Sequence, residues 1–76
     1  ARTYVMVEYD VCASALQEAC AITPGIESPT VAPLSKPDWM AVKAMARRSD
    51  VNVIMDALEV VGATGIIITD IRTCRI

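Results

Sequence analysis

The residue types best suited to bind a small polar molecule are an aspartate near the N-terminus and a short stretch rich in hydroxyl groups. The aspartate is Asp10, and the stretch is residues 23–30, Thr-Pro-Gly-Ile-Glu-Ser-Pro-Thr. A free amino acid needs a carboxylate for its ammonium group, and N–H or hydroxyl donors for its own carboxylate. Each charge-assisted hydrogen bond of this kind contributes about 1.5–3 kcal/mol. One hypothesis is therefore amino-acid recognition, with Asp10 at the ammonium group and Ser28, Thr30 and turn amides at the carboxylate.

Other residues could complete such a site. Ile26 and Met45 could line a pocket for the side chain of the ligand, and Gly65 could allow close approach to the backbone. Glu27 could support the turn. An ordinary surface turn explains the same stretch, because Pro24 followed by glycine is typical of a tight turn. The residue types alone leave both interpretations open.

Asp10 also has a purely structural interpretation. It precedes residues 12–22, an alanine-rich run of good helix formers. A short carboxylate at the start of a helix accepts hydrogen bonds from backbone N–H groups that have no partner within the helix. Capping of this helix is therefore an alternative role for Asp10.

Apolar and polar residues alternate in the segments that must position these side chains. Residues 3–9 alternate as in a strand, and residues 29–34 and 39–46 are typical of a hairpin. The two prolines of residues 29–34 favour an edge strand. Side chains of the first strand and of residues 39–46 divide between two faces. In the first strand, Tyr4, Met6, Glu8 and Asp10 share one face, and its polar end suggests that it leaves the core near Asp10. In residues 39–46, Trp39, Ala41, Lys43 and Met45 share one face, and Met40, Val42, Ala44 and Ala46 share the other.

The second half of the chain predicts a helix followed by a strand. Residues 50–61 carry an apolar stripe at helical spacing, with Ser49 or Asp50 as the cap and Gly62 past the end. The stripe consists of Val51, Ile54, Met55, Leu58 and Val61. Residues 64–70 form a nearly continuous apolar run, which predicts a strand buried on both sides. Residues 71–76 could add a short final strand.

The expected order is strand, helix, strand, strand, helix, strand. This is the split βαβ pattern of α+β, ferredoxin-like folds, with two helices on one face of a four-stranded antiparallel sheet. We expect the other face to pack on a neighbouring subunit or domain. The fold itself assigns no function, because it occurs with many unrelated activities.

Length limits what the chain can do alone. Its 76 residues make one small domain, residues 1–76, and such a domain buries only about 60% of the surface its unfolded chain exposes. Oligomerisation or docking on a larger body would supply the missing burial. The chain begins with Ala1 rather than methionine, so we expect it to be a piece of a longer protein.

Composition argues against several classes of partner and site. Net charge is −2, and the seven Lys and Arg residues are scattered, so a nucleic-acid footprint is lacking. No stretch is long enough to span a bilayer, and the N-terminus lacks a signal-peptide layout. The three cysteines have no spacing typical of a disulfide or metal site, which favours free thiols in a reducing cytoplasm.

Residues for catalysis are also missing. The chain has no histidine, no phosphate-binding glycine motif and no nucleophile beside a base. Glu8 and Asp10 form an acid pair on one strand face, without a nucleophile or a base of another type next to them. We therefore expect no catalytic residue, no metal and no cofactor in these 76 residues.

Five segments of the sequence are typical of one known family. They are TPGIESPT, WMAVK, DVNVIMDAL, VGA and the ending TDIRTCRI. With these segments, essentially the whole chain resembles the C-terminal regulatory domain of the long form of ATP phosphoribosyltransferase. That enzyme joins ATP to phosphoribosyl pyrophosphate with magnesium in the first step of histidine biosynthesis, and histidine inhibits it by feedback. The resemblance implies a ferredoxin-like domain, a homo-hexameric parent enzyme and catalytic domains elsewhere in the same chain.

The resemblance also implies a binding site for L-histidine on this domain. The family's histidine contacts fall on five positions of this sequence: Asp10, Ile26, Thr30, Met45 and Gly65. Asp10 would hold the ammonium group and Thr30 the carboxylate end, and the other three would shape the pocket. Relatives commonly have leucine at the positions of Ile26 and Met45, so the shape of the pocket could differ here. The leading hypothesis is an allosteric histidine sensor, and the alternative is a module that only assembles the oligomer.

Overall fold

Four antiparallel strands form one sheet in the computed structural model, which describes residues 3–75. In chain order the elements are β1 (Tyr4–Cys12), α1 (Leu16–Ile22), β2 (Thr30–Pro33), β3 (Trp39–Arg47), α2 (Val51–Val60) and β4 (Thr64–Asp70). Short 3-10 turns, Ala13–Ala15 and Arg48–Asp50, precede the two helices. The strand order is β2-β3-β1-β4, with every neighbouring pair antiparallel. The predicted α+β, ferredoxin-like fold is confirmed.

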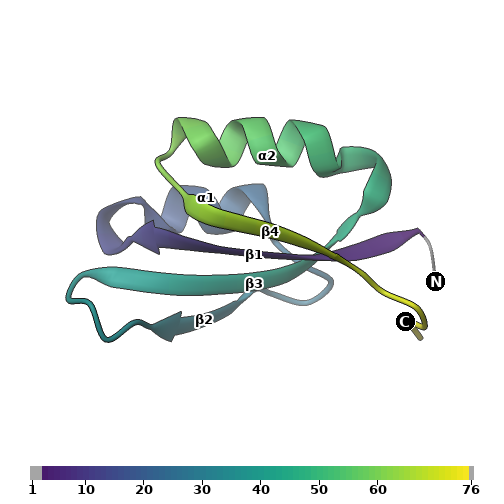
Figure 1. Cartoon of the computed structure of the whole chain (residues 1–76), viewed down its shortest axis with the longest axis horizontal. Coiled ribbons are helices and arrows are strands. Elements are labelled where there is room, and N and C mark those ends of the chain that lie inside the picture. Colours follow the sequence, from purple (N-terminus) through teal and green to yellow (C-terminus); the bar gives the residue numbers. More distant parts are fainter. Residues whose placement is uncertain (1–2, 76) are drawn as a thin grey trace.

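Both helices lie on one face of the sheet and leave the other face open (Figure 1). The core lies between the helices and the sheet, and its centre is β1, whose inward side chains Val5, Val7 and Val11 are fully buried. This is the face that the alternation in the sequence predicts. Within residues 3–75, no helix is long and apolar enough to cross a membrane.

β1 is longer than the sequence predicts, and this changes the interpretation of Asp10. Pairing with β3 continues to Cys12, which lies opposite Trp39. Asp10 is therefore inside a strand, opposite Ala41, and not at a helix terminus. The N-cap residue of α1 is Ala15, without a side-chain hydrogen bond to the helix. The capping role for Asp10 is wrong, because strand pairing overrides the helical preference of the residues that follow it.

α2 packs through the predicted stripe except at Met55, which is half-buried and is not part of the core cluster. Ile54 and Leu58 are buried, and Val51 and Val61 pack against the same core. Asp50 occupies the N-cap position as expected, although its side chain makes no capping hydrogen bond. Gly62 adopts φ 88° just past the helix, the left-handed conformation expected at this position.

The prediction that residues 64–70 are buried on both sides is wrong, because one face of β4 is exposed and the strand also lies at an edge of the sheet. β4 pairs only with β1. Ile66 and Ile68 pack against the core, whereas Ile67 is 56% exposed. An apolar run gives no sign of whether a strand has one neighbour or two. Residues 71–75 form no strand, and position 76 lies outside the described residues.

A buried hydroxyl pair joins the end of α1 to the middle of β1. The Tyr9 hydroxyl lies 2.7 Å from Thr23 Oγ1, and Thr23 Oγ1 donates to the Ala19 carbonyl at 3.4 Å. Either hydroxyl can donate in the contact between Tyr9 and Thr23. Burial raises the pKa of the Tyr9 phenol, and the hydrogen bond to Thr23 opposes that rise. The pair satisfies both polar groups inside the core.

Candidate functional site

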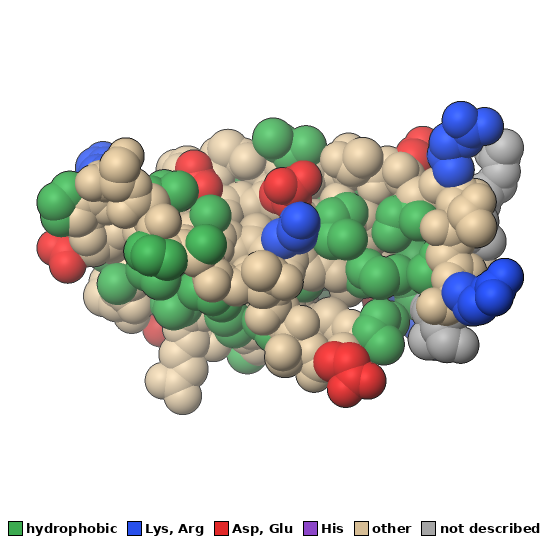
Figure 2. Space-filling view, turned by 90° about the horizontal axis from the view of Figure 1, so that it is seen from below, with side chains coloured by type: hydrophobic (Ala, Val, Ile, Leu, Met, Phe, Trp, Pro, Cys, Tyr) green, Lys and Arg blue, Asp and Glu red, His purple; other side chains and the backbone are tan. Residues whose placement is uncertain are grey.

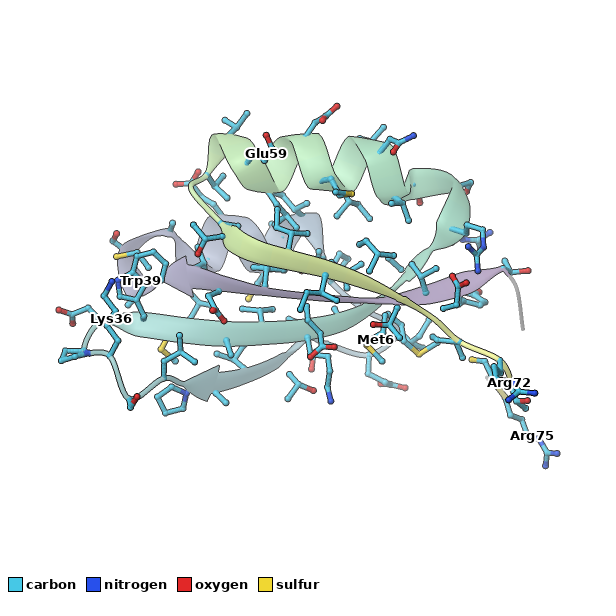
Figure 3. All side chains as sticks on the ribbon, in the orientation of Figure 1. Met6, Lys36, Trp39, Glu59, Arg72 and Arg75 are labelled. Carbon is cyan, nitrogen blue, oxygen red and sulfur yellow. The ribbon has the colours of Figure 1, made fainter. Side chains whose placement is uncertain are left out.

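The open face of the sheet is built from rows of side chains that lie across the strands. Antiparallel partners point to the same face, so the register fixes each row. One row contains Thr30, Lys43, Glu8 and Ile67. Met6 lies on this helix-free side of the sheet (Figure 3). Figure 2 views the same face, where acidic and basic side chains adjoin near the middle among hydrophobic ones.

The neighbouring row is made of small residues and forms a depression, which we name the alanine hollow. Ala32 lies opposite Ala41, and Ala41 lies opposite Asp10. The two methyl side chains leave a space of about 330 Å³ beside the half-buried Asp10. The lining residues are Glu8, Tyr9, Asp10, Thr30, Ala32, Ala41, Val42, Lys43, Gly65 and Ile67. The hollow therefore has an apolar floor and a charged margin.

Gly65 lies directly beside Asp10 in the alanine hollow. The β1–β4 pairing shifts register between Glu8 and Asp10, and Gly65 adopts φ 60° in this region. A Cβ built on Gly65 would be 3.8 Å from Asp10 Oδ2, an ordinary contact distance. The backbone conformation, rather than lack of space, therefore favours glycine at this position.

A second depression, which we name the loop hollow, lies on the other side of the Thr30–Lys43–Glu8 row. Its volume is about 270 Å³, and its lining residues are Met6, Ile26, Glu27, Ser28, Thr30, Lys43, Ala44 and Met45. The loop that brings residues 26–28 to this hollow bends at residues 26–27, directly after Gly25, whose φ is 72°. A Cβ on Gly25 would lie 3.1 Å from the Ser28 carbonyl oxygen, so both space and conformation favour glycine there.

The structure brings all seven predicted contact and support residues to the open face, but in two adjoining hollows. Asp10 and Gly65 line the alanine hollow. Ile26 and Met45, with the supporting residues Glu27 and Ser28, line the loop hollow. Thr30 lines both. The carboxylate and the apolar contacts are therefore separated by one row of side chains, with Thr30 at the junction.

Sequence reasoning missed the residues that join the two hollows. Lys43 lines both of them, and Glu8 lies opposite Lys43 across β1 and β3. Ala32 and Ala41, which form the floor, carry no functional group and gave no signal. The alternation in the sequence puts Lys43 on the same face of its strand as Met45, and Glu8 on the same face as Asp10. Only the register between β1 and β3 shows that Lys43 and Glu8 are neighbours.

A larger depression of about 560 Å³ lies beside the end of α1 and the start of α2. Its lining includes Thr23, Pro24, Arg47 and Val53, as well as Ile26 and Met45. Asp10, Thr30 and Gly65 are not among its lining residues. This depression is also lined by the Asp50 carboxylate, whereas its Thr23 hydroxyl is already hydrogen-bonded to Tyr9 and Ala19. We favour the two smaller hollows as the candidate site, because Asp10, Thr30 and Gly65, to which the resemblance assigns histidine contacts, lie there.

Lys36, in the turn between β2 and β3, and Trp39, the first residue of β3, line neither hollow. The Lys36 ammonium group lies 4.8 Å from the centroid of the Trp39 ring (Figure 3). A cation over an aromatic face is attracted by about 0.5–1 kcal/mol at an exposed site. Lys36 is therefore in contact with Trp39, outside both hollows.

Comparisons with known proteins assign the family. The family described as "HisG, C-terminal domain" matches residues 1–73. An ATP phosphoribosyltransferase of Salinibacter ruber is 63% identical over 75 residues, 99% of this chain and 26% of that protein. Proteins of the same name from Mycobacterium tuberculosis and Mycolicibacterium gilvum are 57% and 51% identical, each over 95% of this chain. The chain spans about a quarter of the length of these relatives. It therefore belongs to the family of HisG C-terminal domains, as the resemblance in its sequence predicted.

Proposed function

We propose that this domain is the histidine-binding regulatory part of an ATP phosphoribosyltransferase and mediates feedback inhibition of histidine biosynthesis. The observation that carries the proposal is the alanine hollow, where Asp10 stands beside an apolar floor with Thr30 on the same margin. A carboxylate, a hydroxyl and an apolar surface are the groups that an amino acid requires. The names of the relatives supply the parent activity.

In this proposal each end of histidine has its own partner. The Asp10 carboxylate accepts hydrogen bonds from the ammonium group, and the Thr30 hydroxyl donates to the carboxylate. The imidazole ring extends over the Thr30 row toward Ile26 and Met45 in the loop hollow, where contact is apolar. Ser28 and Glu27 support the turn that holds Ile26 in position.

Regulation requires that histidine binds one arrangement of the parent enzyme better than another. A ligand with equal affinity for the active and inhibited arrangements would shift nothing. The catalytic domains of the same chain would bind ATP and phosphoribosyl pyrophosphate with magnesium, and this domain would carry no cofactor. The parent would be a homo-hexamer in the cytoplasm, a location that the free thiols of Cys12, Cys20 and Cys74 favour.

Calorimetric titration of the chain with histidine tests the proposed site. The Asp10→Asn variant keeps the shape of the side chain and removes its charge, so we expect affinity to fall by about tenfold to a hundredfold. Asp56→Asn is a matched control, because Asp56 is an exposed residue of α2, on the opposite side of the sheet from the hollows. Equal binding by the unaltered chain and Asp10→Asn would rule out Asp10 as the anchor.

Assembly of the parent oligomer is a second candidate, favoured by the uncovered apolar residues of the open face. Ile67 is 56% exposed at the centre of an edge strand. Sedimentation of the chain with and without histidine distinguishes the candidates. An oligomer that forms without histidine, in a chain that calorimetry shows not to bind histidine, would support assembly alone.

A further inference from the structure

We infer that Lys43 is a further ligand-binding residue and provides the positive charge for the carboxylate of the bound amino acid. The inference rests on the function proposed above and adds a residue to it. Lys43 is in the middle of β3, between Thr30 of β2 and Glu8 of β1 in one cross-strand row. It is thus at the boundary between the alanine hollow and the loop hollow, and it lines both.

Binding of a ligand carboxylate in the two hollows requires a cation, because the charges around them are mostly negative. Three carboxylates line them, those of Glu8, Asp10 and Glu27. Among the described residues that line these hollows, Lys43 is the one cation. A ligand carboxylate near three negative side chains would be repelled, and a hydroxyl such as that of Thr30 cannot offset this repulsion alone. The Lys43 ammonium group supplies the attraction that the Thr30 hydroxyl lacks.

The spacing fits an α-amino acid. Asp10 of β1 lies opposite Ala41 of β3. Lys43 is two residues beyond Ala41 on β3, which places it about 7 Å from Ala41 along that strand. Both side chains belong to the open face, so their charged ends can approach a molecule placed between them. The ammonium and carboxylate groups of an α-amino acid leave the same carbon atom. One ligand can therefore contact Asp10 on one side and Lys43 with Thr30 on the other.

Lys43 is also available for this contact. It is exposed, and within residues 3–75 it makes no ion pair, although Glu8 lies directly opposite it. Lys36, the other lysine of the chain, lies over the Trp39 ring in the β2–β3 turn. Lys36 is thus a matched control with the same charge, outside both hollows.

Calorimetry with two ligands isolates the contact. Histidine carries a carboxylate, and histidinamide carries a neutral amide of nearly the same size in its place. We expect Lys43→Met to weaken histidine binding about tenfold, as for loss of one charge-assisted hydrogen bond, and to change histidinamide binding less than about twofold. Lys43→Arg should keep most of the affinity for histidine, and Lys36→Met should bind both ligands as the unaltered chain does.

The outcomes separate this inference from the function on which it rests. Equal histidine binding by the unaltered chain and Lys43→Met would overturn the role of Lys43 and leave histidine binding intact. An equal loss for histidine and histidinamide would also overturn it, since the effect would then be independent of the carboxylate. No histidine binding by the unaltered chain would overturn the proposed function and the role of Lys43 together. Thermal unfolding of each variant checks that it is folded, and Lys43→Gln, which also removes the charge, replaces Lys43→Met if that variant unfolds.

Discussion

On the helix-covered face of β1, Val5, Val7 and Val11 are fully buried, whereas Glu8 and Asp10 on the open face stay partly exposed. The two sets alternate along one strand, so each residue differs in role from its immediate neighbours. One face supplies apolar burial, and the other presents charges and small side chains to solvent. Substitutions on the covered face should therefore change the free energy of unfolding, and substitutions on the open face should change ligand affinity.

The strongest test of this contrast is on α2. Leu58 is fully buried, and Leu58→Ala should lower the free energy of unfolding by about 2–5 kcal/mol. For a chain this short, that loss is a large part of the total stability. Urea unfolding measures it. Val60→Ala on the same helix is the control, because Val60 is 87% exposed and its loss should change stability by less than about 0.5 kcal/mol. Similar losses for both variants would contradict the packing described.

Substitutions of two alanines on opposite faces of β3 allow a direct comparison of the two faces of the sheet. Ala44 is 4% exposed on the covered face, so Ala44→Leu should overpack the core and cost about 1–3 kcal/mol. Ala41 forms part of the floor of the alanine hollow, so Ala41→Leu should fill that space and abolish histidine binding with a stability change below about 0.5 kcal/mol. Urea unfolding and calorimetry on both variants give the two readouts. Histidine binding by Ala41→Leu at full affinity would exclude the alanine hollow as the site.

A smaller effect is expected at the polar contact inside the core. Tyr9→Phe removes the hydrogen bond between the Tyr9 and Thr23 hydroxyls, with an expected cost of about 1 kcal/mol at neutral pH. Thr23 keeps its hydrogen bond to the Ala19 carbonyl, which limits the loss. Thermal unfolding at pH 7 measures the difference. A variant as stable as the unaltered chain would mean that the hydroxyl pair contributes no net stability.

The same pair predicts a dependence on alkaline pH. The folded-state pKa of Tyr9 is raised above its ordinary value of 10.0, chiefly by burial. The folded protein therefore holds this proton more tightly than the unfolded chain does. This contribution is fully present below pH 10.0 and is lost as the pH rises through the folded-state pKa. The free energy of unfolding should thus fall less for Tyr9→Phe than for the unaltered chain when the pH is raised from neutral to strongly alkaline, and urea unfolding at several pH values measures this.

Local patterns in the sequence were enough for the element order and for the two faces of β1. Alternation identified the buried side of β1, and the stripe through Ile54 and Leu58 identified the inner side of α2. Strand neighbours were harder, because they depend on residues far apart in the chain. β1 reaches Cys12 only because Trp39 pairs with it, and the apolar run around Ile67 gave no sign of an edge.

The candidate site was predictable in its residue types and not in its arrangement. Asp10 and Thr30 stood out because their groups suit an amino acid, and the turn after Pro24 stood out for its composition. Lys43 did not, because a lysine in a strand is ordinary until the register sets it between Thr30 and Glu8. The sequence reasoning did not predict a hydrogen-bond partner for the Tyr9 hydroxyl, although a tyrosine on a covered face needs such a partner.

The most direct test of the account is the melting temperature of the chain with each of the twenty amino acids in turn. Binding to the folded state alone adds about 2.7 kcal/mol at about 100 times Kd, which should raise the melting temperature by about 10 °C or more in a domain of this size. We predict that histidine gives this rise and that Asp10→Asn loses most of it. No rise with histidine, or an equal rise with every amino acid, would contradict a histidine site on the open face.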